Sequence, residues 1–133
     1  MEINVTFPGN LKVEAGFSGF TVRTDQPAGV GGDGTAPSPF HLFLASLATC
    51  AGFYVLSFLK QRGIDEAGAG VTMTTVNDPT TGMVAEVQID IELPPEFPEK
   101  YRDAVVRAVN QCSVKRALAQ PPAFTVTTSR PAS

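Results

Sequence analysis

The feature that most constrains this sequence is a run of twenty residues without a formal charge, Phe40 to Leu59. Ser38 and Pro39 precede the run as a cap residue and a first-turn proline, which together mark the start of a helix. Lys60 places a cation in the last turn and Gly63 provides the exit, both favourable at a helix C-terminus. We therefore predict one long helix. Because its surface is apolar all round, it should be enclosed on every side.

A transmembrane helix is the alternative, since twenty helical residues span about 30 Å. Polar residues interrupt the run, however, namely His41, Ser46, Thr49 and Ser57. The rest of the chain also reads as strands and an amphipathic helix that need a core to cover. The sequence therefore favours a soluble protein with no membrane partner. In so short a chain the enclosing material is expected to include a second copy, because small residues beside Cys50 let another backbone approach closely.

Alternating apolar and polar residues predict short strands on both sides of the helix. The expected elements are strands at 3–7, 11–15 and 20–24, the long helix, hairpin strands at 71–76 and 83–93, a helix at 98–111, a short helix at 112–119 and a final strand at 123–128. Residues 25–35, rich in glycine, proline and aspartate, are expected to form an exposed, mobile loop. The fold class is therefore α+β: an N-terminal β-meander, a long central apolar helix, a β-hairpin, a second helix pair and a final strand, in a single domain over residues 1–133.

Composition argues against several classes of protein. The 133-residue chain carries a net charge of −3, which argues against a standing attraction to nucleic acid or anionic membrane surfaces. Its two cysteines are too few for a disulfide scaffold, and no charged and apolar leader follows Met1, so a cytoplasmic location is expected. One histidine and two distant cysteines lack the local pairing of zinc sites. We therefore expect no metal, and no histidine-dependent triad.

Two segments resemble the sequence signatures of the OsmC/Ohr family. The first is GTAPSPFHLFLASLATC at 34–50, where a proline-led helix runs through leucine and alanine into a cysteine. The second is NQCSVKRAL at 110–118, which is similar to the family's Cys-Pro-Val motif followed by a leucine. The order of the predicted elements agrees with the family as well. The resemblance implies an OsmC-like fold in an intertwined homodimer.

The resemblance also implies an antioxidant function in the stress response, the thiol-dependent reduction of small organic hydroperoxides without a cofactor. Carried over by position, Cys50 attacks the peroxide and becomes a sulfenic acid, and Cys112 resolves it as a disulfide. A dithiol such as a lipoyl group then reduces the disulfide. Together these steps make the protein a redox-active peroxidase, an oxidoreductase.

The sequence departs from the active members of the family at two places and leaves a third, the arginine, to a single candidate. They carry a glutamate near the start of the long helix, where this chain has Phe40 and His41. Arg23 is the only arginine before that helix, so it is the candidate for the arginine that binds the thiolate in active members. Ser113 stands in place of the usual proline. The alternative function is therefore a peroxidase-inactive dimer that binds a small hydrophobic ligand in the same apolar pocket.

Residue chemistry alone ranks the two cysteines differently from the resemblance. Cys50 lies mid-helix among apolar neighbours, which raise the pKa of a thiol. Cys112 begins a short helix with Lys115 and Arg116 within a turn, surroundings that favour a thiolate. Position alone therefore ranks Cys112 as the more reactive thiol, whereas the resemblance ranks Cys50 first. The two cations are more typical of a solvated face than of a site.

The expected substrate pocket near Cys50 combines His41 with the apolar residues Phe43, Leu47 and Phe53, which suit an alkyl hydroperoxide. The three apolar residues fit a plain core equally well. His41 lies nine residues before Cys50, about 13 Å along a straight helix and on its opposite side. It can therefore contact only the cysteine of a partner subunit, or its own across a broken helix, and otherwise interacts with solvent or backbone.

Overall fold

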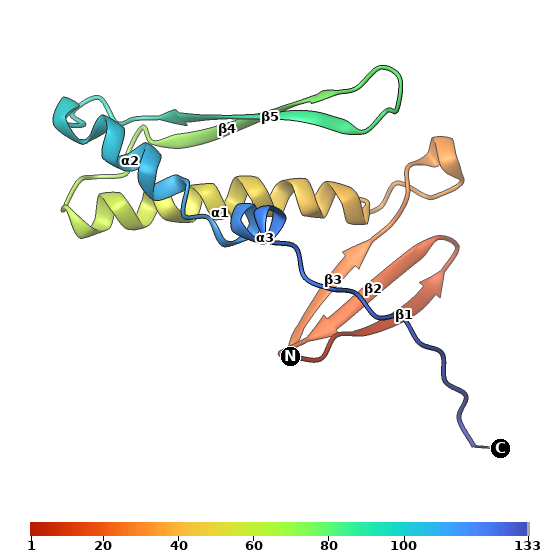
Figure 1. The fold of residues 1–133 in the computed structure, drawn as a ribbon. Coiled ribbons are helices and arrows are strands. Elements are labelled where there is room, and N and C mark those ends of the chain that lie inside the picture. The colour runs from red at the N-terminus through yellow and green to blue at the C-terminus, as the bar shows by residue number, and fades with distance from the viewer. Residues whose placement is uncertain (133) are drawn as a thin grey trace. The chain divides into compact units, whose positions relative to one another are not determined.

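The computed structural model describes residues 1–132 and contains two antiparallel sheets and three α-helices, which confirms the α+β prediction (Figure 1). The chain divides into two compact units, the first covering Met1–Ser46 and the second beginning at Leu47. The division falls inside the long helix α1 (Pro39–Gln61), which begins at the predicted proline and extends two residues beyond the uncharged run.

The first unit contains the predicted β-meander. β1 (Asn4–Gly9), β2 (Lys12–Phe17) and β3 (Phe20–Thr24) pair antiparallel in chain order. The two connecting turns place Asn10 and Gly19 at positive φ, 46° and 81°. Asparagine and glycine are the residues that tolerate this left-handed conformation, so the turn chemistry matches the strand pattern.

The loop after β3 is ordered, which corrects the expectation of a mobile segment. Its centre is the carboxylate of Asp25, which is fully buried and accepts the backbone N–H groups of Gln26 at 2.7 Å and Asp33 at 3.4 Å. Thr35 donates twice to the same carboxylate, from its N–H at 3.0 Å and its hydroxyl at 2.7 Å. A short 3-10 helix, η1 (Ala28–Val30), completes the loop. Hydrogen bonds to one side chain, rather than apolar burial, organise this segment.

Two further residues fit closely into this loop. Lys12 of β2 places its Nζ 4.0 Å from Oδ2 of Asp25 and pairs more closely with Asp33. Gly32 passes so near to Gln26 that a Cβ at this position would lie 1.9 Å from the Gln26 carbonyl oxygen. The loop therefore depends on one particular acid and one particular glycine.

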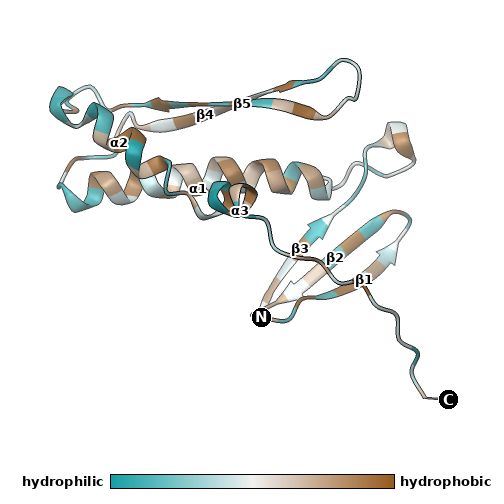
Figure 2. Ribbon diagram, in the orientation of Figure 1, coloured by the Kyte–Doolittle hydropathy of each residue, from teal (hydrophilic) through white to brown (hydrophobic). Residues whose placement is uncertain are grey.

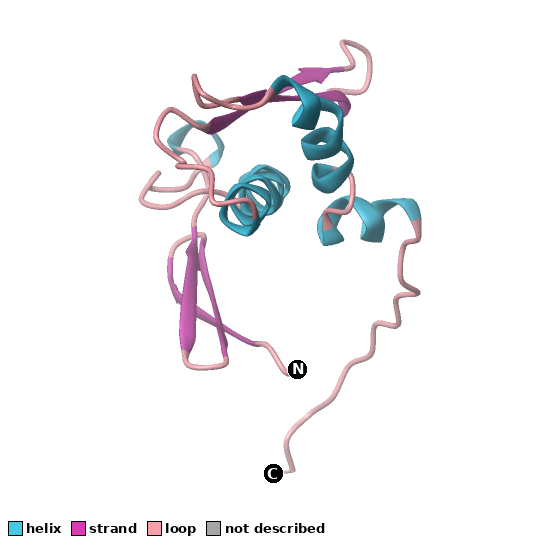
Figure 3. Cartoon of the chain, turned by 90° about the vertical axis from the view of Figure 1, so that its left-hand side faces the viewer, coloured by secondary structure: helices cyan, strands magenta, loops and turns pink. Residues whose placement is uncertain are grey.

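The second unit packs a β-hairpin and two short helices against the C-terminal part of α1. β4 (Gly70–Asn77) and β5 (Val84–Glu92) form the hairpin, and a 3-10 turn, η2 (Glu99–Tyr101), leads into α2 (Arg102–Val109). After a short break, α3 (Ser113–Ala119) follows. Figure 3 views α1 nearly end-on, with the hairpin and α2 on neighbouring sides of it. These elements match the predicted hairpin and helix pair.

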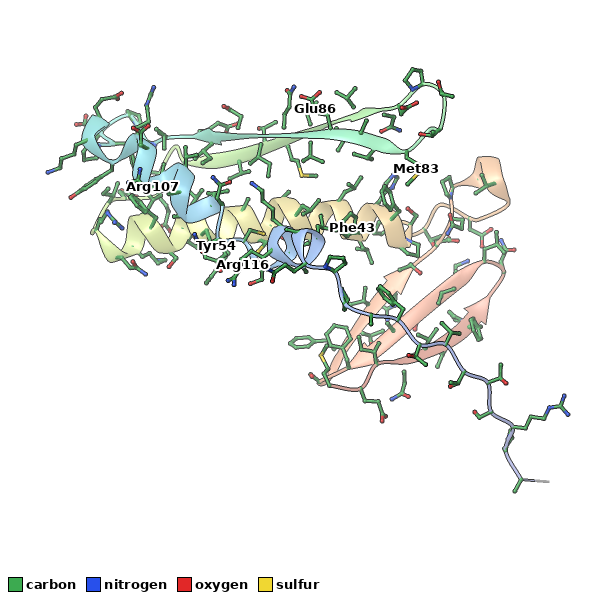
Figure 4. The ribbon with its side chains drawn as sticks, in the orientation of Figure 1. Phe43, Tyr54, Met83, Glu86, Arg107 and Arg116 are labelled. Atoms are coloured by element: carbon green, nitrogen blue, oxygen red, sulfur yellow. The ribbon has the colours of Figure 1, made fainter. Side chains whose placement is uncertain are left out.

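One face of the hairpin packs against the core and the other face is exposed to solvent. Val71, Ile89 and Ile91 pack against the buried core, whereas Glu86 and Asp90 are exposed. Figure 4 shows Glu86 on the side of the hairpin that faces away from α1. This alternation is the one that the sequence predicts for a half-buried strand.

The core of the second unit forms mainly between α1 and α2. Its buried members are Ala51, Val55, Phe58, Leu59, Val105 and Val109. Figure 2 shows apolar stretches along both helices. Each large apolar side chain buried in this way contributes roughly 1.5–3 kcal/mol to folding. The core holds α2 against α1 and so fixes where the chain leaves α2, which is the position of Cys112.

The C-terminal segment departs from the prediction. The final strand expected at 123–128 is not formed, because within the described residues this segment pairs with no other strand. Phe124 and Val126 are instead 85% and 92% exposed. A strand exists only through hydrogen bonds to a neighbouring strand, and in the single chain the apolar pattern of this segment finds no such partner.

Helix α1 is enclosed only in part. Among the described residues it is the one helix long and apolar enough to cross a membrane, with a mean hydropathy of 2.0, but core helices of soluble proteins pass the same test. Only 28% of its most apolar stretch is buried in the chain, and Phe53 and Leu56 stay 62% and 38% exposed. A single chain therefore does not supply the enclosure on every side that the sequence predicts.

Candidate active site

The structure brings the two cysteines together in the second unit. Cys50 lies on α1, beside the buried residue Ala51, and its own side chain is only partly buried. Cys112 lies at the N-cap of α3 and is 3% exposed. Its N–H donates to the Val109 carbonyl at 3.1 Å, and its carbonyl accepts the Arg116 N–H at 3.0 Å. The ends of α2 and α3 thus hold Cys112 in place against α1.

Three neighbouring groups favour the thiolate of Cys50. They are the thiol of Cys112 and the backbone N–H groups of Val114 and Ser113, at the start of α3. Burial by itself raises the pKa of Cys50, but these hydrogen bonds outweigh burial and bring the pKa below its ordinary value of 9.0. Cys50 therefore combines a partly exposed side chain with a pKa below its ordinary value.

Cys112 has the opposite properties. Burial and its hydrogen bond to Cys50 raise the pKa of Cys112 above 9.0, although the N–H groups of Lys115 and Val114 act in the other direction. The ranking from position alone, which made Cys112 the more reactive thiol, is therefore wrong. It neglected that Cys112 is buried and that it donates its proton to the Cys50 sulfur.

A cavity of about 560 Å³ adjoins this pair within the second unit. Apolar side chains from α1, β5, α2 and α3 line much of it, among them Leu47, Ile89, Val105, Val109 and Leu118. Cys112 also lines the cavity, and the polar side chains of Arg102 and Lys115 reach it. Its size and lining are typical of sites that take small, largely apolar ligands.

Two of the predicted pocket residues, Leu47 and Phe53, belong to the second unit. Of the predicted pocket residues, only Leu47 lines it. Phe53 is exposed and stacks edge-on against Tyr54, with ring centroids 5.5 Å apart. His41 and Phe43 belong to the first unit, where the His41 N–H donates to the Ser38 hydroxyl at 3.2 Å.

Arg23 also belongs to the first unit. It lies on β3 and pairs with Glu14 of β2, with 3.3 Å between Arg23 Nε and Glu14 Oε1. Its guanidinium group therefore already has a carboxylate partner within its own sheet.

Sequence reasoning missed the two amides that act on Cys50. Ser113 and Val114 contribute through their backbone, so their side chains carry no signal of this role. The sequence feature that could have indicated this role is the helix predicted to start directly after Cys112. The first N–H groups of any helix have no acceptor within that helix and can act on a neighbouring group. No group of three or more histidine, cysteine or acidic residues that could hold a metal ion occurs among residues 1–132.

Comparisons with known proteins place the chain in a family. The profile described as OsmC-like protein matches residues 32–127, so the chain belongs to the OsmC-like family. A search of curated proteins found no match. The structure resembles that of a candidate osmotic stress induced and detoxification response protein from Psychrobacter arcticus, at 29% identity and a TM-score of 0.72, covering 86% of this chain and 85% of the other.

Two further solved structures share the fold at lower identity. One is a candidate organic hydroperoxide resistance protein from Vibrio cholerae with captopril bound in one of its active sites, at 20% identity and a TM-score of 0.57, covering 91% and 86% of the two chains. The other is the organic hydroperoxide resistance protein OhrB of Bacillus subtilis, at 16% identity and a TM-score of 0.52, covering 91% and 93%. At these identities the similarity establishes the fold alone.

Proposed function

We propose that this protein reduces organic hydroperoxides through a two-cysteine mechanism, with Cys50 as the nucleophile and Cys112 as the resolving thiol. The observation that carries the proposal is the asymmetry of the pair: a partly exposed Cys50 with a lowered pKa accepts a hydrogen bond from a buried Cys112 with a raised pKa. Membership in the OsmC-like family and fold neighbours named for hydroperoxide resistance support the same reaction.

The first step oxidises Cys50. Its thiolate attacks the terminal oxygen of the hydroperoxide, so that an S–O bond forms, the O–O bond breaks and an alkoxide leaves. The thiol proton of Cys112, already directed at this sulfur, can pass to the alkoxide and release an alcohol. Cys50 is then a sulfenic acid and Cys112 a thiolate.

The second step uses this thiolate. Cys112 attacks the Cys50 sulfur, an S–S bond forms and hydroxide leaves, which takes a proton to become water. The two thiols are close enough to shift each other's pKa, so the partner for the disulfide is at hand. A dithiol reductant then supplies two electrons and two protons, and is itself oxidised to a disulfide. The cycle requires no further cofactor.

The direct test adds one equivalent of cumene hydroperoxide to the reduced protein, with hydrogen peroxide in parallel. Peptide mass spectrometry then follows the free thiols and the Cys50–Cys112 disulfide. The proposal predicts rapid disulfide formation with the organic peroxide and slower formation with hydrogen peroxide, because the cavity beside the pair is largely apolar. Thiols that remain intact in the presence of cumene hydroperoxide would contradict it.

A homodimer that covers α1 belongs to this proposal. The exposed apolar side chains Phe53 and Leu56 on α1 need a cover, and the unpaired segment at 121–132 needs a strand partner. A second copy supplies both, and residues 1–133 then act as one domain completed by the partner. Light scattering at micromolar concentration tests this arrangement: twice the chain mass is expected, and a monomer would contradict it. A cytoplasmic location, where dithiol reductants are available, remains a prediction.

The second candidate function is binding of a small hydrophobic ligand without peroxide chemistry. The observation that favours it is that the 560 Å³ cavity is lined by Cys112 but not by Cys50 itself. Extraction of the purified protein and mass spectrometry of the extract would detect a co-purifying lipophile. A bound lipophile, together with thiols that do not react with cumene hydroperoxide, would favour this function over peroxide reduction.

A further inference from the structure

A second groove of the second unit is lined by residues of α1 and α2 and has a volume of about 540 Å³. Its polar lining residues are Tyr54, Ser57, Gln61, Arg62, Arg107 and Gln111. At about 100° per residue, the α2 residues that line it centre on roughly the opposite side of the helix from Val105, Val106 and Val109, which line the cavity. Helix α2 therefore separates an apolar cavity from a polar groove.

The groove contains two arginines and no acidic residue. Neither Arg62 nor Arg107 takes part in an ion pair among residues 1–132, whereas Arg23 and Arg102 each pair with a glutamate. The chain carries a net charge of −3, so carboxylates outnumber cations in it. Two arginines without a carboxylate partner in one groove therefore form a local positive site that is open to an external anion.

Arg62 is held in place by contacts that leave most of its donors free. Its Cζ lies 3.5 Å from the centroid of the Phe58 ring and 5.2 Å from that of Tyr101. Its Nη1 donates to the Phe58 carbonyl at 3.3 Å. A guanidinium group has five N–H donors, so the others remain available to a ligand. Because the side chain is already positioned, it loses less conformational freedom when it binds an anion.

The remaining lining residues supply an aromatic wall and neutral polar groups. Figure 4 shows Tyr54 on α1 and Arg107 on α2. The rings of Tyr54 and Phe58 line the groove, and the Gln61 amide donates to the Ser57 hydroxyl at 3.2 Å. Guanidinium groups bind carboxylates and phosphates through pairs of N–H donors, and aromatic rings accept the apolar body of a ligand. The combination favours an organic anion over an inorganic one.

We propose that this groove is a binding site for a small organic oxyanion, a carboxylate or a phosphate ester on an aromatic or apolar body. Arg62 and Arg107 recognise the charge, and the aromatic side chains contact the body. The site is separate from the cavity but close along α1 to the reactive thiol, because Tyr54 follows Cys50 by one helical turn. The proposal goes beyond peroxide reduction and does not depend on it.

The first test is a nitrogen-15 NMR titration of the parental protein with benzoate and with phenyl phosphate. Benzyl alcohol, which has the same ring and no charge, is the control ligand. The two anions should shift the amide signals of the groove residues at millimolar concentration, and benzyl alcohol should shift them far less. The tighter of the two anions identifies a carboxylate or a phosphate ester as the preferred group. An equal response to benzyl alcohol, or groove signals that stay unchanged with both anions, would overturn the proposal.

The second test compares Arg107→Gln with Arg116→Gln. Both remove one arginine charge from an exposed position, but Arg116 lies on α3 and does not line the groove. Loss of a hydrogen-bonded charge should weaken binding of the better anion by roughly fivefold or more in Arg107→Gln. Arg116→Gln should change it by less than about twofold. Equal affinities in the two variants would overturn the proposal.

The third test is Arg62→Lys, which keeps the charge but not the paired N–H geometry. It should weaken binding several-fold, because an ammonium group cannot bind an oxyanion in the same bidentate way. Parental affinity in this variant would overturn the role of Arg62. Thermal unfolding is measured first, since Arg62 also contacts Phe58 and Tyr101, and Arg107→Gln decides the matter if Arg62→Lys does not fold. No titration contains peroxide, so a protein that binds the anion but leaves cumene hydroperoxide intact keeps this site and loses the proposed function.

Discussion

Asp25 in the first unit and Cys50 in the second are both stabilised as anions by one side-chain donor together with backbone N–H groups, but with different outcomes. Asp25 is fully buried, and its carboxylate accepts four hydrogen bonds. The hydroxyl and N–H of Thr35, with further backbone donors, hold the pKa of Asp25 far below its ordinary value of 3.8. No reactant can reach such a group, so its charge serves to organise a loop.

Cys50 differs from Asp25 in exposure and in the nature of its donors. Its side chain is only partly buried, and one of its three donors is the thiol of Cys112, which can itself give up a proton. Its pKa is lowered, but the anion remains accessible. The comparison teaches that similar sets of donors can hold an enclosed anion, which organises a loop, or lower the pKa of a group that remains accessible.

The largest expected effect on peroxide consumption comes from replacing the cysteines one at a time, because the two have different roles in the proposed mechanism. Cys50→Ser should lower the consumption of cumene hydroperoxide on the order of 10³-fold or more, because it removes the nucleophile. Cys112→Ser should still react once and accumulate a sulfenic acid at Cys50, detectable with dimedone. Parental rates of consumption in Cys50→Ser would contradict the assignment, as would the absence of a sulfenic acid at Cys50 in peroxide-treated Cys112→Ser.

A second effect should be confined to the first unit. Asp25→Asn places an amide NH₂ group where four donors converge, and so leaves donors unpaired in a buried position. We expect a lower urea midpoint and faster proteolysis within residues 25–35. The alkylation midpoint of Cys50 should not move. A shifted Cys50 midpoint would show that the two regions are coupled.

The pH dependence of stability should report Asp25. Because its folded pKa lies below its unfolded pKa, its contribution is fully present above about pH 4 and is lost as the pH falls below the unfolded value toward the folded one. The stability of the parental protein toward urea should therefore fall between about pH 4 and pH 2 by roughly the contribution of this group. The same loss should be smaller in Asp25→Asn, and identical pH profiles would remove Asp25 as the cause.

The smallest effect is expected at Lys115. Its backbone N–H acts on Cys112, but its side chain is exposed and bonds to Asn110. Lys115→Ala keeps the N–H and removes the ammonium group, so the alkylation midpoints of both cysteines should move by less than roughly half a pH unit. A larger shift would mean that a cation, rather than peptide groups, controls the thiols.

Much of the fold could be predicted from the sequence because local signals and burial agreed. Pro39 marked the start of α1, and the alternation around Ile89 and Ile91 identified a half-covered hairpin. The segment at 123–128 has the same kind of alternation but forms no strand. Its pairing depends on a neighbouring strand that local pattern cannot specify.

The candidate site was predictable only in part. The motifs identified Cys50 and Cys112, but nothing in the side chains indicated that the amides of Ser113 and Val114 meet the Cys50 sulfur. Backbone donors are common to almost all residues, so their role appears only when the fold places an acceptor beside them. The same reason explains why the order of the Asp25 loop was missed.

The most direct test of the account is the titration of both thiols in the unaltered, reduced protein. Samples are alkylated briefly with iodoacetamide over pH 5 to 11, and the peptides that contain Cys50 and Cys112 are quantified separately. The account predicts that Cys50 reacts first, with a midpoint below 9.0, and that Cys112 follows with a midpoint above 9.0. Prior reaction of Cys112, or a single midpoint for both thiols, would contradict it.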